Sequence, residues 1–365
     1  MPCNHQKKEI VMRITIRLVI RTAVFAAAAF ITFCAAQQPV TKTAPAGRIV
    51  SSKKDPLPSW SESPVKKRLI AYCSDSVKKI PPEHRVAVFD MDGTIACEEP
   101  LWMEMYAAVY GLNLQSAKDT ALLAKPEYRF AKKLGVNPFD TSVLNHWGPY
   151  ISQMVWTAYT GFGNEVYIDT ARSYLSKTNS RDSRPSLAGK KLVDLFYQPM
   201  LELITLLKEK SFDVYIVSGS LEGVIWAVCP QTIGFPRSHL IGTVQASAPL
   251  YDPEKHLVKF VLQDSIIPPE DNQNGKSLNI YNRLGKMPVF AFGNTDGDFG
   301  MMHFASTSGY PHMALLLNHN DSLREYAYPP YHGKPVPAWQ DTMKINHWIT
   351  VNMAEDFKTV WMKKK

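Results

Sequence analysis

The sequence is poor in cysteine. Its 365 residues include five cysteines, and no two of them have the spacing C-x-x-C. This scarcity excludes a disulfide-stapled scaffold, and the missing C-x-x-C pair removes the usual zinc ligands. Loss of an N-terminal segment, argued below, would leave three cysteines, an odd number with at least one unpaired thiol. Cys97 has no histidine near it in the sequence, so we expect a packed, inert thiol.

A stripe of arginines interleaved with aromatic residues is also missing, and with it the usual sign of a nucleic-acid groove. The chain carries 41 Lys and Arg against 33 Asp and Glu, a formal net charge of +8, scattered in ones, twos and threes. A positive balance favours anionic partners. These partners could be phosphate esters, nucleic acid or anionic lipid surfaces, but without such a stripe we expect no nucleic acid. With 45% hydrophobic and 20% charged residues, the composition is that of a globular protein.

A long hydrophobic run is lacking as well. The apolar stretch TAVFAAAAFITFCAA follows three arginines and is shorter than the roughly 20 residues of a transmembrane helix. It has the length of a signal sequence, so residues 1–36 are predicted to be a signal peptide or membrane anchor, with cleavage before Gln37. Lipidation at Cys34 and initiation at Met12 stay open. We expect an exported protein, periplasmic or envelope-associated, that meets a membrane only through this segment.

The remaining chain indicates an α/β protein. Residues 37–64 are rich in Pro, Ser, Thr and Lys and are predicted to be a flexible linker. Short apolar runs without strict polar alternation then predict strands buried on both faces of a parallel sheet. These runs are Val86–Phe89, Val214–Val217, Leu240–Val244, Val289–Phe292 and Met313–Leu317. Between the first two, YQPMLELITLLKEKSF predicts a helix with one apolar face (Met200, Leu203, Ile204, Leu207).

Helices alternating with strands predict a doubly wound, mostly parallel sheet. Residues 96–195 break this rhythm, because they are long, rich in aromatic residues and helical in pattern. We predict that they form a mainly helical cap inserted into a core made of residues 65–95 and 196–365. The C-terminal part, from about residue 318, is expected to add a strand and a helix at the edge of the sheet.

Two aspartates lie two positions apart directly after the first strand, in RVAVFDMDGTIACEEPLW. Carboxylates that close raise each other's pKa unless a cation shares their site. Three more polar clusters fall at or near the ends of predicted strands: Ser218-Gly219-Ser220, Asn294–Asp298, and Lys276 upstream of the fourth strand. In doubly wound sheets ligands bind outside the carboxyl ends of the strands, so we expect these groups to meet.

Together these residues fit phosphoryl transfer. Asp90 could attack phosphorus and form an aspartyl-phosphate, provided that Mg²⁺ reduces the repulsion between the two anions. Asp90 and the Asn294–Asp298 turn supply the oxygen ligands that Mg²⁺ prefers. Ser218 offers a hydroxyl and nearby backbone N–H groups to the phosphate, and Lys276 a point charge. Asp92 would protonate the leaving alcohol and then accept a proton from water.

The motifs resemble those of the haloacid dehalogenase (HAD) superfamily, in the branch similar to phosphoserine phosphatase. FDMDGT, VYIVSGS, NGKSLNIYNRLGK and FGNTDGDFGMM correspond to its four motifs, and the match covers roughly residues 67–95 and 196–320. The resemblance implies that Asp90 is the nucleophile and Asp92 the general acid and base. It implies phosphate binding by Thr94, Ser218, Gly219 and Lys276. It also implies Mg²⁺ ligation by Asp90, Asp92 (through its main-chain carbonyl), Asn294, Asp296 and Asp298.

Two departures from the family pattern bear on these roles. Many relatives have an aspartate where this chain has Asn294, a weaker ligand, so Asp296 or Asp298 must carry more of the negative charge. Dehalogenases lack the second aspartate of the first motif, so Asp92 favours phosphorus chemistry.

Other interpretations of single motifs stay open. The Asn294–Asp298 turn alone could bind Ca²⁺. Lys286 rivals Lys276 as the phosphate-binding lysine. A P-loop around Lys276 is excluded, since Glu270 stands where glycine is required.

The cap begins with Glu98, Glu99 and Trp102, immediately after the catalytic loop. Acidic and aromatic side chains there could surround a cationic alcohol such as choline, and GPYISQMVWTAYTGFGNEVY is loosely similar to the cap of bacterial phosphorylcholine phosphatases. We predict a Mg²⁺-dependent phosphomonoesterase for a small phosphorylated metabolite, with phosphocholine-like compounds as candidates. A phosphotransferase that uses the same intermediate and a non-catalytic envelope binding protein are the alternatives.

Overall fold

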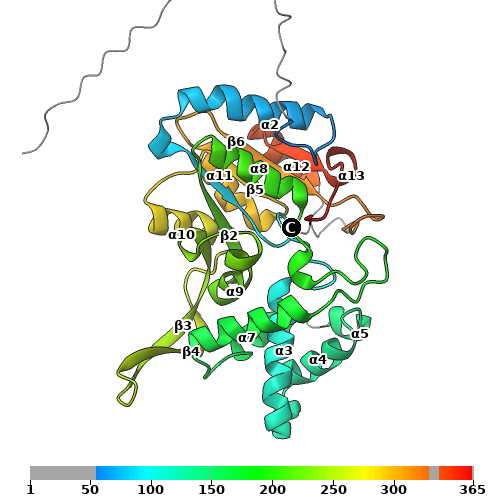
Figure 1. The fold of residues 1–365 in the computed structure, drawn as a ribbon, viewed down its shortest axis with the longest axis vertical. Coiled ribbons are helices and arrows are strands. Elements are labelled where there is room, and N and C mark those ends of the chain that lie inside the picture. Colours follow the sequence, from blue (N-terminus) through cyan, green and yellow to red (C-terminus); the bar gives the residue numbers. More distant parts are fainter. Residues whose placement is uncertain (1–54, 147, 329–336, 364–365) are drawn as a thin grey trace, which may run out of the picture. The chain divides into compact units, whose positions relative to one another are not determined.

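A computed structural model describes residues 55–146, 148–328 and 337–363. These residues form a seven-stranded sheet in the order β4-β3-β2-β1-β5-β6-β7 (Figure 1). Neighbouring strands are parallel except for β3 and β4. The strands are β1 (Val86–Phe89), β2 (Asp213–Leu221), β3 (Leu240–Asp252), β4 (Leu257–Ile267), β5 (Phe290–Gly293), β6 (Met313–Asn318) and β7 (Ile349–Asn352). The predicted α/β fold with a mostly parallel sheet is confirmed.

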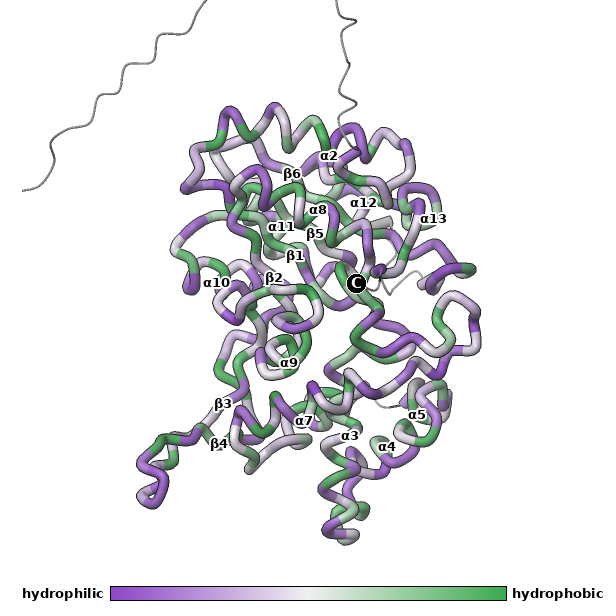
Figure 2. Tube along the Cα trace, viewed as in Figure 1, coloured by the Kyte–Doolittle hydropathy of each residue, from purple (hydrophilic) through white to green (hydrophobic). Residues whose placement is uncertain are grey.

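Both faces of the sheet are covered by helices. Ala87 and Phe89 of β1 pack in one hydrophobic cluster, which includes α2 (Pro64–Asp75) and α8 (Gln198–Glu209). The alternate residues Val86 and Val88 pack in a second cluster, with α10 (Asn274–Leu284) and α11 (Phe299–Ser306). Burial on both faces explains why the strands lack polar alternation, and in Figure 2 hydrophobic segments run along the central strands.

The short apolar runs locate the central strands well. β1 has the predicted bounds, β5 is shifted from its predicted bounds by one residue, and β6 ends one residue later than predicted. The helix predicted from YQPMLELITLLKEKSF is α8, and its predicted apolar face is buried, with each of the four side chains at most 3% exposed. At the C-terminal edge β7 pairs parallel to β6 and is flanked by α12 (Pro337–Ile345) and α13 (Met353–Asp356).

Strand β4 and the outer half of β3 were not predicted. The two strands form an antiparallel hairpin whose outer part carries exposed apolar side chains, including Tyr251, Val258 and Phe260. Near its base, Leu262 exchanges two backbone hydrogen bonds of 2.9 Å with Gly161 and Phe162. The hairpin therefore joins the core to residues 161–163 through long-range pairing, which a local apolar pattern does not reveal.

The prediction of a flexible linker over residues 37–64 fails in its C-terminal part. Residues 55–63 pack on the core: Leu57 and Trp60 are at most 1% exposed, and Trp60 Nε1 donates to the Pro199 carbonyl at 2.9 Å. The prediction is therefore wrong for these residues, because contacts distant in sequence overrode a polar, proline-rich composition. Residues 1–36 and 37–54 lie outside the described residues. Within the described ranges no helix has both the length and the apolar character needed to cross a membrane.

The described residues between 96 and 195, the region predicted as a helical cap, contain five α-helices. Tyr110 and Tyr174 join two of them by stacking, with ring centroids 4.1 Å apart. At the start of the first helix, Glu104 Oε1 accepts a hydrogen bond of 2.6 Å from Leu221 N, at the end of β2. The five helices are α3 (Met103–Lys118), α4 (Pro126–Val136), α5 (Thr141–Leu144), α6 (Ile151–Thr157) and α7 (Asn164–Lys177); the core adds α9 (Glu222–Thr232).

Candidate active site

The loop after β1 holds two aspartates at the edge of one cavity. Asp90 N donates to the Phe292 carbonyl at 2.9 Å, so the nucleophile candidate is fixed by the sheet itself. The chain then turns sharply: Gly93 has φ +73°, and Gly93 N donates to the Ala96 carbonyl at 2.7 Å. A Cβ at Gly93 would lie 1.9 Å from Asn294 Nδ2, so only glycine fits this turn.

Lys276, from α10, is the cation beside the first aspartate. Its Nζ donates to Asp90 Oδ1 at 2.6 Å, to Asp298 Oδ1 at 2.7 Å and to the Val217 carbonyl at 2.8 Å, which uses all three of its protons. Burial opposes its charge, but the charges of Asp298 and Asp90 prevail and raise the pKa of Lys276. The rival Lys286 is exposed and does not line the cavity.

Asp298 organises this cation. Its Oδ2 accepts hydrogen bonds from Asn294 N at 2.8 Å and Thr295 N at 3.1 Å, while its Oδ1 faces Lys276. Because both of its carboxylate oxygens accept hydrogen bonds, Asp298 fixes the positions of Lys276 and of the Asn294–Asp298 turn relative to each other. Burial and the charge of Asp298 raise the pKa of Asp90 to about 8, against the opposing charge of Lys276. A further positive charge nearby would therefore stabilise the ionised form of Asp90.

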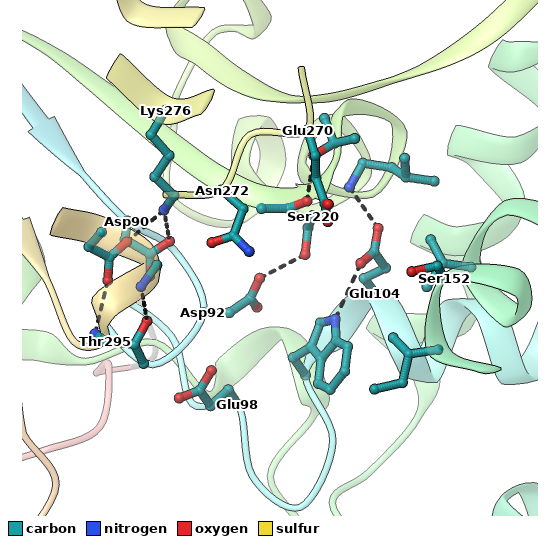
Figure 3. A pocket seen from close by; sticks show the side chains of 18 of the residues that line it. Asp90, Asp92, Glu98, Glu104, Ser152, Ser220, Glu270, Asn272, Lys276 and Thr295 are labelled. Atoms are coloured by element: carbon teal, nitrogen blue, oxygen red, sulfur yellow. Dashed lines mark hydrogen bonds and ion pairs between the residues drawn. The ribbon is translucent and has the colours of Figure 1, made fainter. Parts of the chain in front are cut away.

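Asp92 also lines the cavity, and only one of its two carboxylate oxygens is hydrogen-bonded within the described residues (Figure 3). Its Oδ2 accepts a hydrogen bond from Ser220 Oγ at 2.8 Å and a longer one from Ser218 Oγ at 3.4 Å. Its Oδ1 is buried and has no hydrogen-bond partner among the described residues. Burial raises the pKa of Asp92, while the Ser220 hydrogen bond opposes the rise. Such a carboxyl group can hold a proton and release it.

Asn294 connects the fourth motif to the start of the cap. Its Oδ1 accepts from Thr94 Oγ1 at 3.3 Å, and its Nδ2 donates to Glu98 Oε1 at 2.8 Å. Burial and the charges of Asp92 and Asp90 raise the pKa of Glu98 well above its usual value. Asp296, in contrast, is exposed and does not line the cavity. The turn thus brings no set of converging carboxylates together, which argues against a Ca²⁺ loop.

The cavity has a volume of about 310 Å³ and two different sides. We call the side at the strand ends the floor; it consists of Asp90, Asp92, Lys276, Asn294 and Asp298. We call the opposite side the cap wall; it consists of Trp102, Glu104, Ile151, Val155 and Trp156.

Glu104 binds the cap wall to the core. Besides the hydrogen bond from Leu221 N, it accepts one from Trp102 Nε1 at 3.3 Å. Burial raises the pKa of Glu104 to about 7, and its hydrogen bonds oppose the rise.

The structure brings most of the predicted site residues to this cavity. Ser218 and Thr94 are fully buried just behind the lining, and Glu99, like Asp296, does not line the cavity. Those that line it are Asp90, Asp92, Glu98, Trp102, Gly219, Lys276, Asn294 and Asp298.

The lining residues that were not predicted as site residues include Ser220, Glu104 and Trp156. Ser220 stands in the quoted motif VYIVSGS, but the sequence does not say which serine reaches Asp92. Glu104 and Trp156 have no local signal, because the folding of the cap decides which of its many polar and aromatic residues face the cavity.

No protein-family model matches this chain, and no curated protein matches it either. Similar solved structures include a protein of unknown function from Anaerococcus prevotii, with 17% identity over 73% of this chain and 89% of that one and a TM-score of 0.44. A HAD family hydrolase from Salmonella enterica serovar Typhi has 16% identity over 68% of this chain and 67% of that one, with a TM-score of 0.34. A phosphoserine phosphohydrolase-like protein from Francisella tularensis has 14% identity over 74% and 97%, also with a TM-score of 0.34.

All three structures are less than 20% identical to this chain, with TM-scores below 0.5.

Proposed function

We propose that this protein is a Mg²⁺-dependent phosphomonoesterase that acts through an aspartyl-phosphate on Asp90. The observation that carries the proposal is the arrangement of the floor. Lys276 Nζ lies 2.6 Å from Asp90 Oδ1, and Asp92 presents an unpartnered oxygen in the same cavity. A nucleophile, a cation and an acid–base group in one small site are what phosphoryl transfer requires.

The proposed reaction uses the two aspartates in turn. Asp90 attacks phosphorus, and the bond from phosphorus to the leaving oxygen breaks as Asp92 gives that oxygen its proton. Asp92, now ionised, accepts a proton from a water molecule, which attacks the aspartyl-phosphate and releases phosphate and free Asp90. Lys276 stays close to Asp90 throughout and stabilises the negative charge that gathers on the phosphoryl group.

The donor set supports a hard divalent cation. Six carboxylates line the cavity, and Lys276 is the one basic side chain among its described lining residues. No group of three or more His, Cys, Asp or Glu residues in the described ranges is arranged as a metal site, so ligation would rely on mixed oxygens. Asp90, the side-chain oxygen of Asn294 and the main-chain carbonyl of Asp92 would hold Mg²⁺. When bound, it would reduce the repulsion between Asp90 and the phosphate ester.

The cap wall supports a small leaving group that is apolar or cationic. Trp102 and Trp156 line the cavity, and aromatic rings there would attract a cation. Glu98 is turned to Asn294, and Glu99 lies off the cavity, so the cation site predicted from Glu98, Glu99 and Trp102 shifts toward the wall. We therefore propose phosphocholine-like substrates. From the signal sequence predicted at residues 1–36 we also propose that the enzyme is exported to the periplasm or envelope.

The function is tested with the full chain and p-nitrophenyl phosphate. We expect phosphate release that requires Mg²⁺ and stops with EDTA. Mass spectrometry after acid quenching should find the phosphoryl group, or a beryllofluoride adduct of the native protein, on Asp90. Turnover that persists in EDTA, together with no adduct on Asp90, would remove the proposal.

The substrate class is tested separately, with phosphocholine and phosphoserine. Phosphoserine carries a carboxylate that the acidic lining should repel, so its kcat/KM should be at least about tenfold lower. Trp156→Ala should raise the KM for phosphocholine several-fold and leave that for p-nitrophenyl phosphate within about twofold. Equal effects on both substrates would discard the cation site while leaving the phosphatase proposal intact.

A further inference from the structure

A buried polar cluster lies directly behind the catalytic loop. Strand β6 ends at Asn318, and the next residue, His319, is fully buried together with Glu325. His319 contacts Gly93, the residue that follows Asp92.

Each nitrogen of the His319 ring faces an oxygen. Nε2 lies 2.6 Å from the Gly93 carbonyl oxygen, and Nδ1 lies 3.1 Å from Glu325 Oε2. The ring also stacks on Tyr328, with centroids 3.8 Å apart and planes 5° from parallel. Position, tilt and rotation of the imidazole are all fixed.

These contacts determine which nitrogen of the His319 ring carries a hydrogen. A backbone carbonyl can only accept, so Nε2 must carry the hydrogen that joins it to Gly93. Nδ1 then shares a second hydrogen with Glu325, which either accepts it from an imidazolium ring or donates it to a neutral one. In both cases Glu325 selects the form of His319 that holds Gly93.

Glu325 is itself held in place. Its Oε1 accepts hydrogen bonds from Tyr197 Oη at 2.9 Å and Cys97 Sγ at 3.1 Å, and its Oε2 accepts one from Tyr326 N at 2.6 Å. Burial, followed by the charge of Glu325, raises the pKa of both Tyr197 and Cys97 well above their usual values. Both groups therefore keep their hydrogens and act as donors, and Cys97 has a structural role.

We propose that His319 is a positioning residue for the reaction, holding the Gly93 carbonyl so that the loop keeps Asp92 aligned. Gly93 has a positive φ, and a glycine at such a turn is conformationally free unless a contact restrains it. The inference rests on the proposed function, since alignment matters to the rate only if Asp92 transfers protons. The hold on the loop can nevertheless be measured without any activity.

The first test is hydrogen–deuterium exchange of the full chain. In His319→Ala the amides of residues 90–97 should exchange at least about tenfold faster, while those of α8 stay as in the wild type. His312→Ala is the matched control, because His312 is an exposed histidine just before β6. If His319→Ala does not fold, His319→Gln is measured instead. Unchanged exchange in residues 90–97 would overturn the inference, whether or not the protein is a phosphatase.

The second test uses two leaving groups. Misplacement by a fraction of an ångström should lower kcat by roughly 10- to 100-fold for an alkyl phosphate, which needs a proton from Asp92. The loss should be much smaller for p-nitrophenyl phosphate, and KM should change little. In an Asp92→Asn background His319→Ala should add almost no further loss. Equal losses for both substrates, or additive losses in the double variant, would mean that His319 does not act through Asp92.

Discussion

The floor and the cap wall face each other across one cavity, yet they are built in opposite ways. The floor gathers charged groups at the ends of buried strands, and Lys276 alone makes three hydrogen bonds of 2.6–2.8 Å there. The cap wall is mostly aromatic and aliphatic, with Glu104 as its one charged member among the described residues. Its helices make polar contacts with the core, such as those of Glu104 with Leu221 N and of the Trp156 carbonyl with Gln245.

The difference indicates a division of labour. In the proposed reaction, the groups that move protons and bond to phosphorus need fixed positions, and a parallel sheet provides these. A wall that selects a leaving group needs shape and apolar area instead. Substitutions in the floor should therefore lower kcat strongly, whereas those in the wall should change substrate preference and stability.

The largest expected effect is that of Asp90→Asn. Loss of the nucleophile should reduce phosphate release from p-nitrophenyl phosphate by on the order of 10³-fold or more. Asp296→Asn is the matched control, since this exposed aspartate was predicted as a metal ligand but does not line the cavity. We expect its kcat to stay within about twofold of the wild type. A large loss of kcat in the control would mean that Asp296 is a metal ligand, as first predicted.

Asp92→Asn should follow, with a loss that depends on the substrate. Removal of a general acid and base costs roughly 10²- to 10⁴-fold. The upper end is expected for an alkyl phosphate, because its leaving alcohol needs a proton, and a smaller loss for p-nitrophenyl phosphate. A plot of kcat against the pKa of the leaving group measures this. The same slope in the variant and the wild type would exclude Asp92 as the acid.

Lys276→Met tests the centre of the floor through both rate and stability. The change leaves Asp90 and Asp298 buried without their cation, which should lower the free energy of unfolding by about 3–5 kcal/mol and kcat by roughly 10²-fold. Lys286→Met removes the rival lysine, which is exposed, and should alter neither. Urea unfolding and phosphate release give the two readouts. Equal effects of the two variants would contradict the assignment of Lys276.

The smallest effect is expected in the cap wall, from Glu104→Gln. The pKa of about 7 lies above the usual 4.5, so the folded state holds this proton longer than the unfolded state. Wild-type stability should therefore fall as the pH rises from about 4.5 to 7, by on the order of 2–3 kcal/mol. Glutamine cannot ionise, so the variant should lack this part of the decline in urea unfolding curves. Glu209→Gln, at an exposed site, serves as the control. If the stability of Glu104→Gln and that of the wild type changed with pH in the same way, the raised pKa of Glu104 would be refuted.

Much of the sheet could be predicted from the sequence, because strands buried on two faces leave short, continuous apolar runs. β1 is the best case, with all four residues at most 1% exposed. The same rule failed for the outer β3–β4 hairpin, whose Tyr251 and Phe260 are exposed and whose base is fixed by pairing with residues 161 and 162. Trp60 was missed for a related reason, since its partner Pro199 lies 139 residues away.

The candidate site divides in the same way. Asp90, Asp92, Ser218 and Asn294 could be named in advance, because each follows a predicted strand and parallel strands end at one edge of the sheet. Lys276 was predicted with Lys286 left open as a rival, and only the structure shows that Lys276 contacts Asp90. Which serine lies closest to Asp92 was not predicted. The role of His319 was likewise hidden, because nothing near it in the sequence points to Gly93.

The sequence by itself determined the alternation of helices with the central buried strands and the polar residues that follow those strands, since local apolar patterns and short motifs encode both. Only the tertiary structure decided which charges pair. Lys276 meets Asp90 across 186 positions and His319 meets Gly93 across 226. Contacts at such separations depend on how the sheet and its helices pack, and packing is a property of the whole folded chain.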